Sequence, residues 1–281
     1  MHGTYDAKKA QHKAYVRRRK AKYQGKKIVE HSGLQDLVEE LLYDDQSPQA
    51  VAGRLQRHHQ KIPSVSKESI YRYIKSPYGR RLEHYREKKQ TKRRQRRPTR
   101  GVLDGRIFID KRPQSINDRK RVGHAEGDFI VSGKSGAGIL LVVVDRKLRV
   151  AFLEQILKPS LKAVTRACVR IKKRYPEWKT MTTDNDLLFA HHLILEKKLG
   201  IIIYFCHPYS SWEKGTVENT NKRIRKDIPK RSDISRYSKY FIRSLEAKLN
   251  RRFLKCLDYH SPSEMLASYR KQKQRRCVVK K

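Results

Sequence analysis

The chain has 281 residues, room for two compact domains or one large one, and it carries 68 Lys and Arg against 28 Asp and Glu. The resulting formal net charge of +40 indicates a nucleic-acid partner, because a polyanion relieves the self-repulsion of so many cations. No apolar stretch approaches the roughly 20 residues that span a bilayer, and the start lacks a signal-peptide core, so we expect no membrane partner and a cytoplasmic, nucleoid-associated location.

Residues 1–32 form a basic arm, with ten Lys or Arg between Lys8 and Lys27. The Ala and Gln content favours a helix on DNA, but the segment has little apolar face. A solvated arm without fixed structure is an equally good interpretation.

Residues 33–76 change in character, since apolar side chains now recur at helical spacing. Ser47 followed by Pro48 is typical of a helix start, and Ser66 can cap a third helix over residues 67–75. Three short helices of this kind predict a helix-turn-helix variant whose third helix lies in the major groove. A three-helix spacer is the alternative. The outward-facing candidates for DNA contact are Lys67, Ser69, Tyr71 and Arg72.

Residues 77–120 read as a basic linker. Between Arg80 and Arg100 there are eleven basic and two acidic residues, with almost nothing apolar. Such a stretch cannot bury a core, so it either follows DNA phosphates or acts as a solvated tether.

Residues 121–270 alternate between strand and helix patterns, and a basic tail, 271–281, follows them. Strands are expected at 129–131, 139–144, 150–156, 179–183 and 201–206, and helices at 160–174, 187–199, 212–225 and 240–252. Three strands, then helix, strand, helix, strand and helix is the order of ribonuclease-H-like nucleases. The predicted fold class is therefore α/β, a mixed five-stranded sheet with helices on both faces.

Three carboxylates in this part of the chain suit phosphodiester chemistry. Two divalent ions about 4 Å apart serve such reactions well, and Mg²⁺ prefers carboxylate oxygens. Asp128 lies on the first strand and Asp184 directly follows the fourth, so neighbouring strands would bring them together; Glu218 lies on a later helix. Lys222 and Arg225 share the helical face of Glu218 and are candidates to hold DNA phosphates. Taken singly, each acid is more often a surface charge.

An ordered series of motifs resembles the transposases of the insertion sequence 30 family over nearly the whole chain. In the catalytic part the resemblance lies in residues 109–128, which end in Gly-His-Ala-Glu-Gly-Asp, and in residues 207–221, with Glu-Lys-Gly-Thr-Val-Glu-Asn. Residues 249–252 and 261–264 resemble the closing motif. Residues 47–55 and 65–74 resemble the family's second DNA-binding segment. The 33 residues between Asp184 and Glu218 also fit the family.

This resemblance implies an integrase-type core in which Asp128, Asp184 and Glu218 are the catalytic and metal-binding triad. It implies Mg²⁺ as the cofactor, with Mn²⁺ as a substitute. The implied activity is nicking at the ends of a mobile element and transfer of the freed 3′-hydroxyl to target DNA. The implied partners are the terminal inverted repeats, the target DNA and further copies of the chain on that DNA.

Four more residues are weaker candidates. His124 and Asn219 could support the metal site, although a turn residue with an ordinary hydrogen bond is at least as good an interpretation of His124. Tyr209 and Trp212 could stack on an unpaired base, and an aromatic anchor for the loop is the more frequent role of such residues.

Several positions depart from the family's pattern. Ala125 stands where members usually have Trp, Asp186 where they usually have Gly, and Val217 where they usually have Asn. Asp186 adds a negative charge that either binds metal or disturbs the site. Members also normally open with another helix-turn-helix, which we expect this chain to lack. The alternatives are therefore a catalytically impaired DNA-binding fragment that regulates transposition, a ribosomal or nucleoid structural protein, and a general nuclease of the same fold.

Overall fold

The computed structural model describes residues 6–21, 26–59, 61–85, 105–133, 136–208 and 210–278. The chain divides into two compact units. The first, here called the helical unit, comprises Met1–Thr91 together with Phe253–Tyr259; the second, the core unit, comprises Lys92–Arg252 and His260–Lys281. Residues 86–104, the most basic part of the predicted linker, lie outside the described residues, and so does Tyr209.

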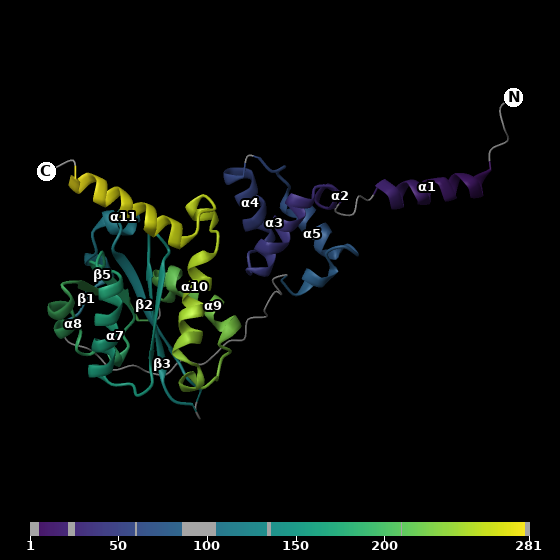
Figure 1. Cartoon of the computed structure of the whole chain (residues 1–281). Helices are drawn as coiled ribbons and strands as arrows, with labels where there is room; N and C mark the ends of the chain where they lie inside the picture. Colours follow the sequence, from purple (N-terminus) through teal and green to yellow (C-terminus); the bar gives the residue numbers. More distant parts are fainter. Residues whose placement is uncertain are drawn as a thin grey trace. The chain divides into compact units, whose positions relative to one another are not determined.

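The Met1–Thr91 part of the helical unit contains five α-helices and a short 3₁₀ helix among its described residues (Figure 1), and the Phe253–Tyr259 part adds the 3₁₀ helix η6 (Lys255–Leu257). Those of the Met1–Thr91 part are α1 (Ala7–Ala21), α2 (Lys26–Val29), α3 (Ser32–Tyr43), α4 (Pro48–His58), α5 (Lys67–Lys75) and η1 (Arg80–Tyr85). Side chains of α2, α3, α4, α5 and η1 share one apolar core. The basic arm is thus helical over α1, and most of its described side chains are exposed.

The two predicted helix starts are confirmed. Ser47 Oγ accepts a hydrogen bond from the backbone N–H of Ala50, with Pro48 as the first residue of α4. Ser66 Oγ accepts from the N–H of Ser69 at 3.2 Å and so caps α5. Each cap satisfies one of the N–H groups that a helix start leaves without an intrahelical partner.

Replacing Ser66 with alanine is expected to lower the free energy of unfolding of the helical unit by about 1 kcal/mol, because the first turn of α5 loses its side-chain acceptor. Chemical denaturation followed by circular dichroism measures the change. Ser64→Ala is the matched control: Ser64 is exposed and accepts a hydrogen bond from Lys27 through its backbone carbonyl, which the substitution keeps. Equal losses in the two variants would contradict the capping role.

The core unit is built on a six-stranded mixed sheet of order β1-β6-β5-β2-β3-β4. The strands are β1 (Ile107–Phe108), β2 (His124–Val131), β3 (Ile139–Asp145), β4 (Ala151–Ile156), β5 (Thr180–Thr183) and β6 (Ile202–Phe205). β2, β3 and β4 pair antiparallel, whereas β5, β6 and β1 continue the sheet in parallel from β2. This is the strand arrangement of the ribonuclease-H-like fold that the sequence predicts.

The sixth strand corrects the prediction of five. Ile107 and Phe108 pair in parallel with Tyr204 and Phe205 at the edge of the sheet, within the segment that the sequence assigns to the linker. Two residues are too few to show the alternation that marks a strand, and basic residues flank them. The hydrophobic pattern of the sequence therefore could not predict β1.

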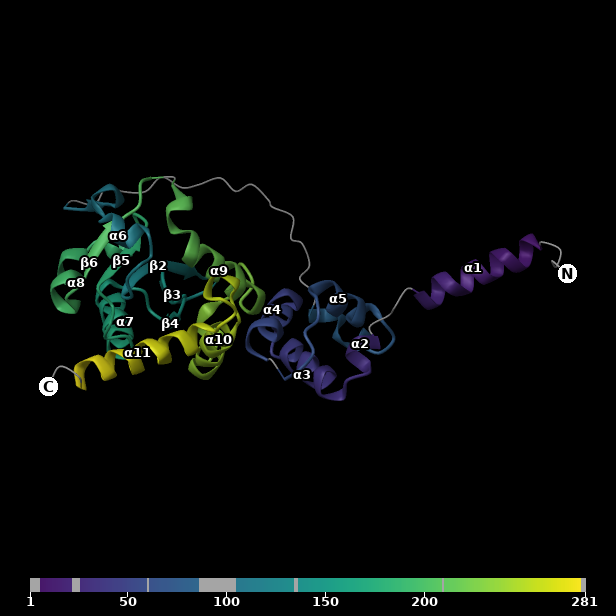
Figure 2. The same cartoon turned by 90° about the horizontal axis from the view of Figure 1, so that it is seen from above.

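Helices cover both faces of the sheet (Figures 1 and 2). The helices are α7 (Leu161–Arg174) and α8 (His192–Leu199) on one face, and α9 (Gly215–Asp227) and α10 (Lys239–Arg251) on the other. Strand β3 is buried throughout, with Leu141 and Val143 in the core on the α7 side and Leu140 and Val142 in the core on the α9 side. This continuous apolar run is what a strand between two helical layers requires.

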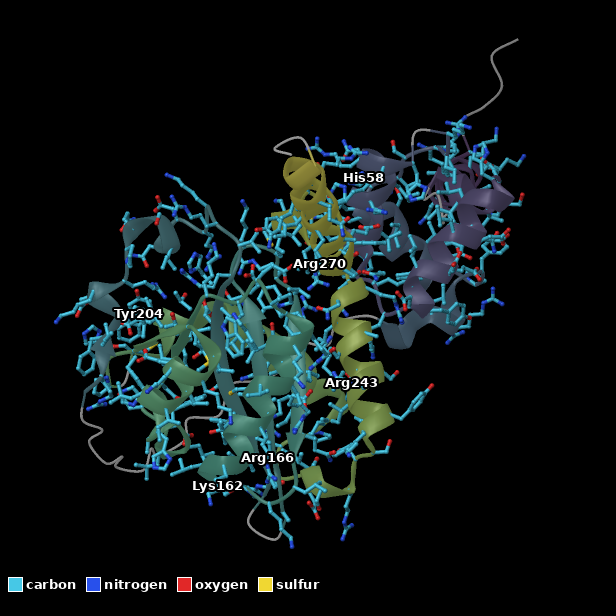
Figure 3. All side chains as sticks on the ribbon, turned by 60° about the vertical axis from the view of Figure 1, so that its left-hand side comes forward. His58, Lys162, Arg166, Tyr204, Arg243 and Arg270 are labelled. Carbon is cyan, nitrogen blue, oxygen red and sulfur yellow. The ribbon has the colours of Figure 1, made fainter. Side chains whose placement is uncertain are left out.

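The helix α11 (Pro262–Val278) is a feature that the sequence analysis does not predict. The side chain of Arg270, labelled in Figure 3, donates from Nε to Glu177 Oε1 at 3.0 Å, and partly buried residues of α11 pack on the core of the α7 side. α11 includes most of the residues that the sequence assigns to a basic tail. No helix in the described part of the chain is long and apolar enough to cross a membrane.

The segment Phe253–Tyr259 belongs to the helical unit, although the sequence places it inside the core. His58 bonds to the carbonyl of Asp258, and the ring of Tyr259 lies so close to Gly53 that a Cβ there would meet it at 2.1 Å. A side chain at position 53 would therefore require the ring of Tyr259 to move.

Candidate active site

Asp128 lies within β2, and Asp184 directly follows the neighbouring parallel strand β5. The register of β2 and β5 pairs His124 with Thr180 and Glu126 with Thr182, and two residues further it brings Asp128 beside Asp184. Gly127 separates Glu126 from Asp128, and a Cβ at Gly127 would lie 2.7 Å from the sulfur of Met181. The side chain of Met181 thus packs directly against the backbone of Gly127.

The ammonium group of Lys214 lies between the two carboxylates. Its Nζ is 3.1 Å from Asp128 Oδ1 and 3.5 Å from Asp184 Oδ2. The lysine side chain is only 6 % exposed, and the two aspartates are about one-quarter exposed or less. Lys214 ends the 3₁₀ helix η4 (Ser211–Lys214) and directly precedes α9. Nothing in the sequence distinguishes this lysine from the other basic residues, and the sequence analysis does not name it.

Burial and charge act against one another in this group. Burial raises the pKa of Asp128 above its ordinary value, and Lys214 opposes that rise only in part, while Asp184 adds to it. Burial lowers the pKa of Lys214, but the charges of Asp128 and Asp184 raise it more, and the result lies above the ordinary value. The ammonium is therefore the charged partner that stabilises two neighbouring carboxylates.

Asn221 is a second residue of the site that the sequence analysis does not name. Its Nδ2 donates to Asp128 Oδ2 at 2.6 Å, while its buried Oδ1 has no hydrogen-bond partner among the described residues. Glu218 lies one turn earlier on α9 and shares the face of Asn221. In the described part of the chain, however, no three His, Cys, Asp or Glu side chains come close enough to hold a metal ion together. The structure thus brings Asp128 and Asp184 together and leaves Glu218 outside that pair.

Glu126 fixes the start of the helix that carries Asn221 and Glu218. Its side chain is fully buried, and its Oε2 accepts hydrogen bonds from the backbone N–H groups of Thr216 at 2.8 Å and Val217 at 3.0 Å. Its other oxygen accepts from Arg146 Nε at 3.1 Å. A carboxylate at this place satisfies two N–H groups of the helix start and is favoured by the helix dipole. The strand that carries Asp128 is thereby joined to α9.

The loop before Lys214 is closed by a histidine. His207 accepts or donates through Nδ1 at 3.0 Å to Glu213 Oε1, its backbone N–H donates to the same carboxylate, and its Nε2 lies 2.8 Å from Asp110. Trp212, inside this loop, is 75 % exposed. The indole is therefore a surface group at the rim of the site rather than an anchor of the loop.

Three predicted supporting residues have other surroundings. His124 is buried and bonds through Nδ1 to Thr180 Oγ1 at 2.9 Å; burial lowers its pKa to about 4, so the ring is neutral. Asn219 is exposed. Asp186 accepts from the backbone N–H of Leu188 at 2.9 Å and caps the short helix η3 (Leu187–Phe189). The additional acid of the Asp184-Asn-Asp186 sequence thus takes part in a local turn.

Ala125 is also accommodated. It is fully buried, and it belongs to the same apolar core as Trp178, which is fully buried as well and donates from Nε1 to the carbonyl of Thr180. Trp178, which precedes β5, therefore supplies a tryptophan to the core that contains Ala125.

The predicted DNA-contact residues are mostly at the surface. Lys67, Tyr71 and Arg72 on α5 are exposed, and Ser69 is half-buried with its hydroxyl 3.2 Å from that of Ser66. On α9, Lys222 is exposed.

Arg225 has a different role from the one its spacing suggests. It donates from Nη1 to the carbonyl of Pro229 at 3.1 Å and from Nη2 to that of Val131 at 3.5 Å. It therefore ties the end of α9 to the end of β2.

The site suits a hard divalent cation. Two carboxylates from separate strands, an amide oxygen without a hydrogen-bond partner and an internal cation between the carboxylates form an oxygen-rich place that already holds one positive charge. Mg²⁺ and similar ions take a few carboxylate oxygens from the protein and complete their shell with water. Asp128 and Asp184 would hold the ion, with Asn221 and Glu218 on the adjoining helix face.

No family model matches the chain. Relatives are found nonetheless. The transposase for insertion sequence element IS4351 of Bacteroides fragilis is 35 % identical over 268 residues, which cover 93 % of this chain and 80 % of the relative. The transposase for IS1086 of Cupriavidus metallidurans is 33 % identical over 94 % of this chain and 81 % of its own. Transposase InsI for IS30A of Escherichia coli is 32 % identical over 83 % and 64 %. Among solved structures, the catalytic core domain of BIV integrase covers 54 % of this chain and 98 % of its own length, with a TM-score of 0.41 and 18 % identity.

Proposed function

Since this chain belongs to the insertion sequence 30 family of transposases, we propose that it nicks DNA at the ends of a mobile element and joins the freed 3′-hydroxyl to target DNA. The chain is a DNA transposase, an enzyme of a class that works with divalent metal ions. The proposal assigns the chemistry to Asp128, Asp184 and Glu218. The first two hold the ion, and Glu218 joins them from α9 when DNA and metal are bound.

The observation that carries this assignment is the cation held between Asp128 on β2 and Asp184 at the end of the neighbouring parallel strand β5. Ordinary surface carboxylates gain little from a single exposed lysine, whereas here a buried ammonium lies within 3.5 Å of an oxygen of each of two neighbouring carboxylates. Binding sites in open sheets with parallel strands commonly lie at the carboxyl ends of those strands.

In the reaction, each residue has a role that follows from its contacts. Bound divalent ions would supply a Lewis acid for the scissile phosphate and would activate the attacking water or 3′-hydroxyl. Asp128 and Asp184 hold the ions in place, and Asn221 orients the Asp128 carboxylate through its 2.6 Å hydrogen bond. Glu126 fixes the start of α9, the helix that carries Asn221, Glu218 and Lys222.

DNA is the partner that this surface fits. The net charge of +40 favours binding to DNA phosphates without sequence preference. The exposed side chains of Lys67, Tyr71 and Arg72 on α5 would contact bases in the major groove. We propose that the helical unit positions the chain on the terminal repeats. We also propose that further copies of the chain assemble on the two ends, because two separated ends have to meet one target.

The experiment that tests the function is a cleavage and strand-transfer assay on labelled DNA that carries the element's own ends. We expect nicked and joined products with Mg²⁺ and with Mn²⁺, and none in EDTA, while a mobility shift persists in all three conditions. Cleavage in EDTA would contradict the role of the metal. Binding without cleavage in either metal would instead favour a regulator that occupies the ends.

A further inference from the structure

The place between Asp128 and Asp184 is filled by the ammonium group of Lys214. Lys214 Nζ lies within 3.5 Å of an oxygen of each carboxylate, and its side chain is almost completely buried. A divalent ion held by the same carboxylates needs their oxygens at about 2.0–2.6 Å. An ammonium group and such an ion cannot share this space, both because of their size and because their charges repel.

We propose that Lys214 is an internal counter-ion of the metal site, which neutralises Asp128 and Asp184 in the metal-free chain and leaves them when a divalent cation binds. The inference rests on the proposed function, because it takes these two aspartates as metal ligands. It goes further in assigning to Lys214 a competition with the metal and a second position.

The surroundings of Lys214 allow such a movement. The residue stands at the junction of η4 and α9. A lysine carries its charge as a point at the end of a flexible four-carbon stem, so the ammonium can move while the backbone stays in place. α9 does not depend on the ammonium, because Glu126 holds its first N–H groups.

The displaced ammonium has an evident new partner. Once an ion neutralises the aspartates, the charge of Lys214 is repelled from the site toward the rim, where exposed Trp212 lies two residues away. Phosphates of bound DNA are the anions that reach this rim. Metal and DNA would then favour the same position of Lys214, and each would assist the binding of the other.

The alternative is a fixed lysine that holds the start of α9 against β2 while metal binds elsewhere on the face of α9. Under that alternative, removal of the charge on Lys214 would leave metal affinity unchanged or would weaken it. The two interpretations therefore predict opposite changes.

The first measurement is the binding of Mn²⁺ to the full chain without DNA, from the electron paramagnetic resonance signal of the free ion. Lys214→Met keeps the length of the side chain and removes its charge, and we expect it to bind Mn²⁺ on the order of tenfold more tightly than the wild type. The matched control is Lys162→Met. Lys162, labelled in Figure 3, is exposed on α7, on the other face of the sheet, and its loss should leave the affinity as it is.

A second measurement uses the wild-type chain and so does not depend on the folding of a variant. Lysines are acetylated briefly with a labelled reagent, and the modification at each position is quantified by peptide mass spectrometry. We expect Lys214 to be protected without metal and labelled several-fold more at saturating Mg²⁺. Lys162 should be labelled equally in both conditions. A Lys214 that stays protected at saturating Mg²⁺ overturns the inference.

The failure of this inference can be told apart from failure of the proposed function by an Asp184→Ala chain in the same titration. Mn²⁺ binding that is lost in Asp184→Ala but is not tightened in Lys214→Met supports the metal site and overturns the role of Lys214. Equal Mn²⁺ binding by the wild type and Asp184→Ala overturns both.

Discussion

Replacing Asp184 with alanine is expected to lower the rates of strand cleavage and strand transfer by about 10³-fold or more, while the affinity for DNA stays nearly unchanged. The expected loss follows from the metal. A bound ion contributes several kcal/mol to the transition state, and each 1.36 kcal/mol is a factor of ten in rate. DNA affinity depends mainly on the many cations of the chain, which the variant retains. Single-turnover assays on pre-bound DNA give the rates, and mobility shifts give the affinity.

Asp186→Asn is the matched control for this prediction, since it removes a carboxylate only two residues away. Asp186 caps η3 through the N–H of Leu188, and asparagine is an equally good cap. We expect this variant to cleave at close to the wild-type rate. An inactive Asp186→Asn together with an active Asp184→Ala would show that the metal-binding acid had been assigned to the wrong position.

The second large effect is on stability. Glu126→Ala is expected to lower the free energy of unfolding of the core unit by about 3–5 kcal/mol, because it leaves the buried guanidinium of Arg146 without its carboxylate. Two N–H groups at the start of α9 lose their acceptor as well. Urea denaturation followed by tryptophan fluorescence measures the change, since Trp178 and Trp212 both belong to the core unit.

The control for Glu126→Ala is the double variant with Arg146→Met. Removing the stranded charge as well should make the double variant no less stable than Glu126→Ala alone, whereas independent contributions would add. A loss below about 1 kcal/mol in Glu126→Ala would contradict the anchoring of α9, since loss of a buried charged partner costs several times that amount.

The strands and helices near this site followed well from the sequence. The run at 139–144 is apolar on both faces, and this pattern identifies a strand covered by helices on both sides. Ser47 and Ser66 marked their helices through a local rule of hydrogen bonding that needs no tertiary information. Asp128 and Asp184 could be paired because the predicted ribonuclease-H-like fold makes their strands neighbours, although they do not follow one another in the chain.

The residues that complete the site were not predictable in the same way. Lys214 is one of 68 basic residues. Its burial between two carboxylates depends on where η4 packs against the sheet, which is a tertiary contact. Asn221 and Glu126 acquire their roles from contacts about 90 residues apart in the chain. The hydrophobic periodicity of a helix or strand indicates which of its faces is buried. It does not indicate which polar side chain of another element that face will contact.

The two tryptophans of the chain differ as widely as two such residues can. Trp178 is fully buried in the core, whereas Trp212 is 75 % exposed beside Lys214. A soluble quencher such as acrylamide reaches the second indole and not the first, so the quenchable part of the emission comes from a single place. The unlabelled protein thus contains an exposed optical reporter two residues from Lys214, and the binding and release of ligands near it can be timed by stopped-flow fluorescence without any added dye.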